Sequence, residues 1–306
     1  MKVGSWTSLR SALCGKEAVE EIQKSAYVPS SVAPLGDQQM TGNPAYFYER
    51  ELVPAIFDTW APVVVDFAPC NAGETILDLA CGTGAVTRVA AQRVGITGEV
   101  VALDINGAML AMARTSISNR KDLSSGRLEW HEGDACTMPF PDNSFDVIYC
   151  AFGFHLFSDR TASLREMHRV LKVRGRMALS VWGHIERSPG FHVLAGALER
   201  HISAEASGKV RAAFGLHDSA HLRTMVDDVG FQDIAVQTQV RNARFCSVEH
   251  FVQTCVGGSR LNAHLSRADH AARGRFVDEI KKILLRHITP EGLTFPIEAH
   301  IARAKK

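Results

Sequence analysis

The sequence lacks the features that mark several large classes of protein. Its seven cysteines include no C-x-x-C pair, which argues against structural zinc and against a disulfide framework. It has no apolar run of about 18 residues, so no transmembrane helix is predicted, and its N-terminus lacks the apolar segment of a signal peptide. These absences predict a cytoplasmic protein with reduced thiols.

The chain also lacks an excess of charge of either sign. Its 34 lysines and arginines balance 33 aspartates and glutamates, which gives a formal net charge of +1 at pH 7, and no long basic run is present. Without a basic surface, binding to nucleic acid or to an anionic membrane is not expected. The 306 residues, 46% of them hydrophobic, suffice for one large α/β domain with insertions, expected to act as a monomer or homodimer.

The most informative segment is residues 76–84, which read Ile-Leu-Asp-Leu-Ala-Cys-Gly-Thr-Gly. A short apolar strand ends in a glycine turn, and a helical pattern follows at once. Gly82 and Gly84 permit positive φ and let a ligand approach the backbone. One acid, Asp78, lies within the strand, and a second, Asp104, ends the next predicted strand, 22 residues after Gly82. An acid at that place can accept hydrogen bonds from both ribose hydroxyls, so the pattern predicts a nucleotide-like ligand.

The turn does not match the dinucleotide fingerprint, because Thr87 stands where G-x-G-x-x-G has its third glycine. The string D-x-A-C-G-T-G instead resembles the first motif of class I S-adenosylmethionine (SAM) methyltransferases. This resemblance implies that Asp78 lies near the methionine ammonium and that Asp104 binds the ribose. An ordinary strand–helix turn with solvent-facing acids is the alternative.

A second block, Glu132-Gly-Asp-Ala135 followed by residues 138–146, resembles the third and fourth motifs of small-molecule methyltransferases. The closest resemblance is to the ubiquinone/menaquinone C-methyltransferase-like branch, over residues 42–182 well and over 183–306 more loosely. It implies that Asp134 hydrogen-bonds the adenine amino group and that the next amide serves an adenine ring nitrogen. A plain turn-forming role for Asp134 is the alternative.

The implied cofactor is therefore SAM, with S-adenosyl-L-homocysteine as the product. Tyr46 and Tyr48 are expected to cover the cofactor, and Phe152 is expected near the sulfonium, where an aromatic face is favourable. The predicted cofactor-binding residues are Tyr46, Tyr48, Asp78, Ala80, Cys81, Gly82, Thr83, Gly84, Asp104, Ile105, Met109, Gly133, Asp134, Ala135, Ala151 and Phe152.

Two histidines that follow predicted strands are the predicted general bases. His155 follows the strand at 145–150, where the methyl acceptor is expected, and an unperturbed pKa near 6.5 suits proton transfer at neutral pH. His184, just after the strand at 175–182, is the second choice. Either histidine could instead pack at its strand exit. A dedicated base matters less if the acceptor is already anionic, and no metal site is predicted.

Alternating strands and helices predict an α/β fold. We expect a doubly wound, seven-stranded, mostly parallel sheet, the Rossmann-like methyltransferase fold, with helical insertions that form a substrate lid. The predicted parts are a flexible N-terminal extension (1–36), a SAM-binding core with an N-terminal helical cap (37–183), a helical insertion (184–216), a core helix and strand six (217–240), a second helical insertion (241–290) and a final strand (291–306).

Four local expectations accompany this scheme. Residues 44–69 are predicted to be helical, and Ser188 is predicted to cap the helix that starts at Pro189. A helix in the second insertion is predicted to bury Phe276, Ile280, Ile283 and Leu284 on one side. Pro296 suits an edge better than a central strand, so 241–246 is an alternative position for the final strand.

The predicted function is SAM-dependent methyl transfer, by direct displacement, to carbon or oxygen of a small, largely apolar molecule such as a quinone, phenol or polyketide. The insertions would supply Phe191, Phe214, Phe245 and Phe251 to enclose it. No N-P-P-Y-type tetrapeptide follows strand four, which argues against amino-group methylation of nucleic-acid bases or of protein glutamine. The alternatives are a SAM-binding protein without catalysis, a decarboxylase or cyclase that uses the sulfonium charge, and a NAD-dependent oxidoreductase.

Overall fold

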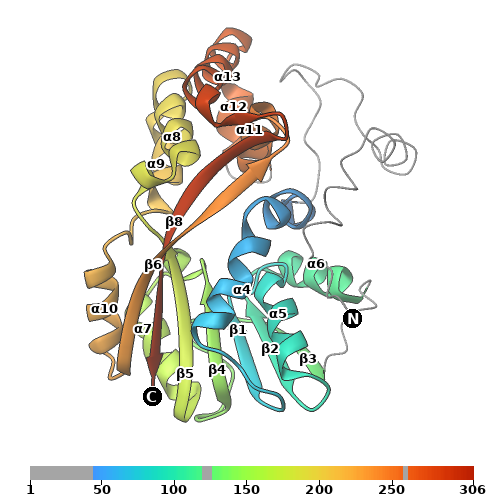
Figure 1. The fold of residues 1–306 in the computed structure, drawn as a ribbon, viewed down its shortest axis with the longest axis vertical. Helices are drawn as coiled ribbons and strands as arrows, with labels where there is room; N and C mark the ends of the chain where they lie inside the picture. Colours follow the sequence, from blue (N-terminus) through green and yellow to red (C-terminus); the bar gives the residue numbers. More distant parts are fainter. Residues whose placement is uncertain (1–43, 119–125, 258–260) are drawn as a thin grey trace, which may run out of the picture. The chain divides into compact units, whose positions relative to one another are not determined.

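A computed structural model describes residues 44–118, 126–257 and 261–306, so the predicted extension over 1–36 lies outside the described residues. Seven strands form the sheet in the order β3-β2-β1-β4-β5-β8-β6 (Figure 1). They are β1 (Thr75–Leu79), β2 (Glu99–Asp104), β3 (Arg127–Glu132), β4 (Phe145–Ala151), β5 (Leu171–Trp182), β6 (Gln232–Phe245) and β8 (Gly292–Lys305), and the two-residue β7 (Ile288–Thr289) pairs with β8. The first five pair in parallel, whereas β8 is antiparallel to β5 and β6, which confirms the predicted mostly parallel sheet.

Helices cover both faces of this sheet, because alternate strand residues point to opposite sides. On one face Ile76 and Val147 are fully buried with residues of α4 (Asp58–Phe67) and α5 (Ala85–Val94). On the other face Leu77 and Ile148 are buried with residues of α7 (Arg160–Val170) and α10 (Ser219–Asp227). α6 (Gly107–Ser118) lies over β2 and β3. The doubly wound core is therefore confirmed.

The predicted helix at 44–69 is divided into three parts. A short α3 (Pro44–Phe47) leads into a π-helix, η1 (Tyr48–Phe57), and then into α4. Pro54 lies inside η1, and a proline has no N–H to donate to the preceding turn of an α-helix. The apolar pattern predicted a helix here, but such a pattern does not distinguish an α-helix from the wider π-helix. Short π-helical segments often occur at functional sites.

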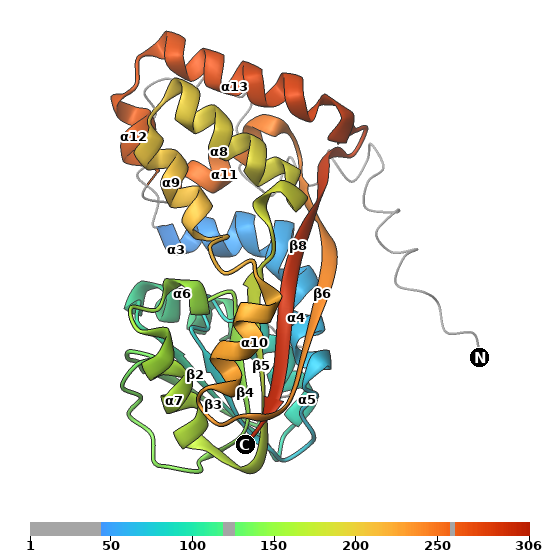
Figure 2. The ribbon, with the colours of Figure 1, turned by 90° about the vertical axis from the view of Figure 1, so that its left-hand side faces the viewer.

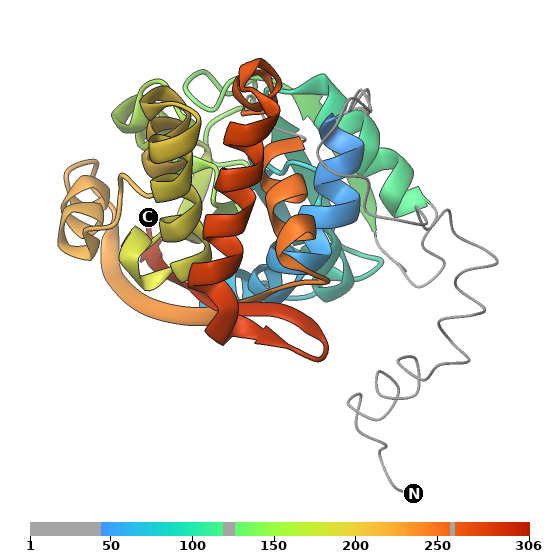
Figure 3. The same ribbon diagram turned by 90° about the horizontal axis from the view of Figure 1, so that it is seen from above.

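The two insertions pack together beyond the carboxyl end of β5. The first contains η3 (Ile185–Arg187), α8 (Pro189–His201) and α9 (Ala204–Ala212), and the second contains α11 (Val248–Gly257), α12 (Asn262–Arg267), α13 (His270–Leu284) and η4 (Leu285–His287). Figure 2 shows β6 and β8 continuing past β5 as a ribbon to these helices, and Figure 3 shows α8, α13 and α11 side by side. No helix in the described ranges is long and apolar enough to cross a membrane.

One predicted strand boundary is wrong, and one alternative for the final strand is excluded. Residues 241–245 belong to β6, so the second insertion begins after Phe245 rather than at 241, and 241–246 is not a separate last strand. The last strand is β8, and Pro296 lies inside it, opposite Asn242. The pairing of β8 with β5 ends at Ala299, so β8 is a local edge at Pro296 and the missing N–H costs no ladder hydrogen bond to β5.

Two predicted side-chain roles need correction. Ser188 is the N-cap residue of α8, as predicted, but its side chain makes no capping hydrogen bond; its buried hydroxyl instead accepts a hydrogen bond from the Glu298 amide at 3.3 Å. Ile283 is 42% exposed, although Phe276, Ile280 and Leu284 of the same helix are buried as predicted. The buried stripe of α13 is therefore narrower than the sequence pattern indicates.

Candidate cofactor and active site

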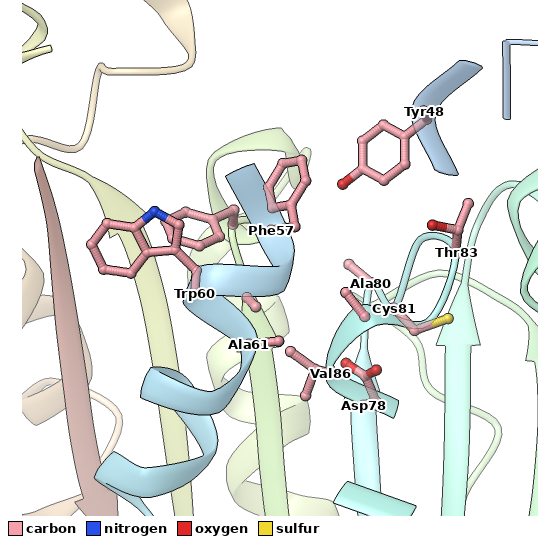
Figure 4. Close-up of a pocket in the computed structure, with 12 residues that line it drawn as sticks. Tyr48, Phe57, Trp60, Ala61, Asp78, Ala80, Cys81, Thr83 and Val86 are labelled. Carbon is pink, nitrogen blue, oxygen red and sulfur yellow. The ribbon is translucent and has the colours of Figure 1, made fainter. Parts of the chain in front are cut away.

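A small cavity lies at the carboxyl ends of β1 and β4, where the strand order reverses (Figure 4). Ligands of open α/β sheets bind at this reversal. The cavity measures about 30 Å³, far below the roughly 300–1,000 Å³ of a typical small-molecule site. The lining residues are Tyr48, Phe57, Trp60, Ala61, Asp78, Ala80, Cys81, Thr83, Ala85, Val86, Ala151 and Phe152.

The glycine turn forms one wall of this cavity. Gly82 and Gly84 have φ values of 55° and 85°, in the region that favours glycine. The Gly84 amide bonds the Cys81 carbonyl at 2.9 Å, and α5 begins at the next residue. A side chain on Gly82 would contact the ring of Tyr48, with its Cβ 3.7 Å away. Cys81 and Thr83 of this turn line the cavity, and the two glycines between and after them supply the positive φ values that the turn requires.

The two predicted acids lie beside this turn. Asp104 accepts hydrogen bonds from the Gly82 amide at 2.8 Å and from the Asn106 amide at 2.9 Å, and burial raises its pKa. Asp78 is 1% exposed, and burial raises its pKa to about 7 even though it accepts a 2.5 Å hydrogen bond from the Thr87 hydroxyl. A cationic ligand group next to Asp78 would favour its ionised form.

Thr87 is a site residue that the sequence argument missed. In the sequence it served only to exclude the dinucleotide fingerprint, yet its hydroxyl is the direct partner of Asp78. Its position in the first turn of α5 was the signal in the sequence that could have identified it. A threonine at that position can reach back to an acid near the end of the preceding strand, here Asp78.

The cavity also holds a free polar group and an aromatic wall. The Thr83 hydroxyl is buried and has no hydrogen-bond partner in the part of the chain that the structure describes, which is unusual unless a ligand or water supplies one. Phe57, Trp60 and Phe152 line the opposite side, and Phe152 stacks on Trp182 with ring centroids 3.7 Å apart. The site thus pairs a polar half with an aromatic half.

Several predicted cofactor residues do not line the cavity. Gly133 donates to the Asp104 carbonyl at 3.1 Å, and the Asp134 carboxylate accepts from the Cys136 amide at 2.8 Å, which is also how a turn-forming aspartate would behave. Ala135 is buried and Ile105 is exposed. Half-buried Met109 lies in α6, and Tyr46 is 45% exposed, with its hydroxyl accepting from Arg50 at 2.7 Å.

The two predicted bases occupy different surroundings. His155 lies in the short helix η2 (Phe154–Leu156) after β4; its buried Nδ1 has no partner among the described residues. Burial and the Arg160 charge lower its pKa to about 4, so the imidazole is neutral at pH 7. His184 is 55% exposed, lies 2.5 Å from Glu186 and lines a separate, open surface cavity. Neither histidine lines the cofactor cavity.

The phenylalanines of the insertions pack on one another. Phe245 stacks on Phe295, Phe251 contacts both rings, and Phe191 lies 5.6 Å from Phe214 between ring centroids. None of these rings lines the cofactor cavity. In the described ranges no three His, Cys, Asp or Glu side chains could hold a metal ion together.

Comparison with known proteins agrees with the site. The model of the ubiE/COQ5 methyltransferase family matches residues 52–191. A ubiquinone/menaquinone biosynthesis C-methyltransferase, UbiE of Escherichia coli O1:K1, is 35% identical over 186 residues, which are 57% of this chain and 73% of that protein.

Solved structures share the fold. A putative methyltransferase from Bacillus halodurans superimposes with a TM-score of 0.53 at 20% sequence identity. The aligned region covers 81% of this chain and 99% of that protein. Phosphoethanolamine N-methyltransferase 2 of Haemonchus contortus, in complex with S-adenosylhomocysteine, superimposes with a TM-score of 0.54 at 20% sequence identity. The aligned region covers 91% of this chain and 61% of that protein. The chain belongs to the ubiE/COQ5 family of SAM-dependent methyltransferases.

Proposed function

We propose that the acceptor is a small, largely apolar molecule of quinone, phenol or polyketide type, methylated at carbon or oxygen. The observation that carries this proposal is the wall of Phe57, Trp60 and Phe152 in the same cavity as the glycine turn. An apolar, aromatic lining with a few polar groups is usual for such acceptors. The E. coli relative is a C-methyltransferase, which supports carbon as the acceptor atom.

The polar half of the cavity would hold the cofactor. In this proposal Asp78 accepts from the cationic methionine end of the cofactor and Asp104 accepts from its ribose hydroxyls. The buried Thr83 hydroxyl, which has no partner among the described residues, supplies a further hydrogen bond. Asp134 and the backbone after it would serve the adenine. When bound, SAM supplies a methyl group on a positively charged sulfur. The residues already present therefore fit the cofactor by their chemistry.

The contribution of the aromatic wall is orientation and exclusion of water. Holding two reacting atoms in line at about 3–3.5 Å can supply roughly 7–11 kcal/mol of a barrier. Trp60 is 1% exposed, Phe152 is 6% exposed, and Trp182 supports both from behind. Stacked rings of this kind move little, so they can fix the plane of a flat acceptor.

We infer that His155, rather than His184, accepts a proton when the acceptor must lose one. Its lowered pKa keeps the ring neutral at working pH, and its Nδ1 is free to accept. Burial also makes it a weak base, which suits an acceptor that is acidic or partly ionised. Replacing a general base lowers kcat by roughly 10²–10⁴. We expect a loss in that range for His155→Gln and less than twofold for His184→Gln.

The direct test is a panel of phenols, quinols and polyketides, together with small amines as nitrogen acceptors, incubated with methyl-labelled SAM and the purified protein. Label in a carbon- or oxygen-methylated product supports the proposal, and product analysis identifies the atom. Label found only on nitrogen acceptors contradicts it. Protein that retains SAM or its product but labels no acceptor favours the non-methylating alternative.

A further inference from the structure

Two residues that line the cofactor cavity have a backbone conformation that residues other than glycine rarely adopt. Ala80, directly after β1, and Phe152, directly after β4, both have a φ of 56°. β1 and β4 are neighbours in the sheet, so both left-handed residues lie where the strand order reverses. For a bulky residue such as phenylalanine this conformation is strained. Strain of this kind persists only where the surrounding structure imposes it, and it gathers at functional sites.

Strand β5 supplies the contacts that fix Phe152. The Phe152 amide donates to the Ser180 carbonyl at 3.1 Å and to the Ser180 hydroxyl at 3.2 Å. Ser180 is fully buried and lies opposite Ala151 in the pairing of β4 with β5. Two residues further along the same face of β5, Trp182 stacks on the Phe152 ring with centroids 3.7 Å apart and 16° between the ring planes. One face of β5 therefore holds both the backbone and the ring of Phe152.

The residue after Phe152 brings this segment against the end of β1. Gly153 has a φ of −95°, so a glycine is not needed there for a left-handed backbone. A Cβ on Gly153 would instead lie 2.5 Å from the Cβ of Ala80, closer than two side chains can approach. None of these contacts involves η1, so they would persist if Tyr48 moved aside to admit a ligand larger than the present cavity.

The Phe152 ring gives the cavity an aromatic face that a less strained residue would not. A glycine at this position would adopt the same φ without strain, but it would remove the ring that joins Phe57 and Trp60 in the aromatic half of the cavity (Figure 4). An aromatic face attracts a cation placed over it, which corresponds to roughly two- to thirtyfold in affinity. SAM carries a positive charge on its sulfur, and S-adenosylhomocysteine does not. A ring held at a fixed angle therefore favours the cofactor over its product.

We propose that Phe152 is a specificity-determining residue that makes the site prefer SAM to S-adenosylhomocysteine, and that Ser180 and Trp182 are positioning residues that hold its ring in place. Ser180 acts through the Phe152 backbone, and Trp182 acts through the Phe152 ring. A site that binds the product more weakly exchanges it more readily for fresh cofactor. The proposal rests on the cofactor and not on the acceptor, so it stands or falls separately from the proposed function.

The experiment measures the Kd of SAM and the Kd of S-adenosylhomocysteine by calorimetry, with the full chain and without an acceptor. Phe152→Leu keeps an apolar side chain but removes the aromatic face, so we expect the Kd of SAM to rise about fivefold and that of S-adenosylhomocysteine less than about twofold. Ser180→Ala removes one of the two acceptors of the Phe152 amide. In that variant the ratio of the two Kd values, SAM over S-adenosylhomocysteine, should rise about two- to threefold.

Ser188→Ala is the matched control for the serine variant. Ser188 is also fully buried, and its hydroxyl also accepts from a backbone amide, that of Glu298, at 3.3 Å, but it does not line the cofactor cavity. Loss of a buried hydroxyl costs stability at either position. Only the change at Ser180 should alter the ratio of the two Kd values, and the ratio in S188A should equal that of wild type.

Two results would overturn the proposal. One is an equal rise of both Kd values in Phe152→Leu, because lost packing alone weakens both ligands alike. The other is a ratio in Ser180→Ala that does not differ from the ratio in Ser188→Ala. The thermal midpoint shows whether each variant is folded. If F152L is not folded, Phe152→Met takes its place with the same expectation, because the flexible methionine side chain fills irregular space more easily.

Discussion

Replacement of Asp78 by asparagine should make the folded protein more stable at alkaline pH while it weakens cofactor binding. Burial raises the pKa of Asp78 from 3.8 to about 7, so the folded state holds this proton more tightly than the unfolded chain does. The stability that protonated Asp78 contributes to the folded state is fully present below pH 3.8. It is lost as the pH rises through about 7, where the buried carboxyl group ionises. The lost stability is on the order of 4 kcal/mol, at roughly 1.4 kcal/mol per pKa unit.

Asparagine has nearly the same shape, can still accept from Thr87 and does not ionise. The assay is urea unfolding of both proteins, without cofactor, from pH 4.5 to pH 8.5. We expect the unfolding free energy of D78N minus that of wild type to grow by about 3–4 kcal/mol over this range. With saturating SAM the order should reverse at pH 8, because only wild type offers a carboxylate. A difference that does not change with pH would refute the argument from burial.

Three further variants test single contacts. Thr87→Val removes the hydroxyl that bonds the buried acid, so calorimetry should show the Kd for SAM rising about tenfold, with Thr87→Ser near wild type. Gly84→Ala places a side chain at φ 85° and should cost about 1–2 kcal/mol in urea unfolding, whereas Gly208→Ala, in open space on α9, should be neutral or slightly stabilising. Trp182→Ala removes the ring that stacks at 3.7 Å behind the cavity and should cost roughly 3–5 kcal/mol in the same assay.

The glycine turn and its two acids could be predicted because their signal is local. The positive φ values at Gly82 and Gly84 favour glycine. Asp78 lies within β1 and Asp104 ends β2, and both strands are recognisable in the sequence as short apolar runs. Strand ends of a parallel sheet meet at one edge, so these residues come together without further information.

The helix that carries Tyr48 could not be predicted in the same way. The apolar pattern of residues 44–69 fits a helix of either pitch, so the π-helix η1 was not visible, although Tyr48 was expected at the cofactor site and lines the cavity. The ion pair between Arg88 of α5 and Glu49 of η1 joins residues that are 39 positions apart in the sequence. Taken alone, each of these residues would be expected to lie exposed on the surface, so the sequence did not indicate the pair. The length of β6 was missed because Arg241, Asn242 and Arg244 resemble a polar loop, although they continue the ladder with β8.

The central claim is that the glycine turn and Asp104 bind SAM, and thermal unfolding with added ligands tests it most directly. Ligand at about 100 times its Kd stabilises by roughly 2.7 kcal/mol, which shifts the midpoint by a few degrees in a protein of this size. We predict such a shift with SAM and with S-adenosylhomocysteine, none with NAD, and none for any of the three in folded Asp104→Ala. A shift with NAD alone, or an undiminished SAM shift in that variant, would contradict the account.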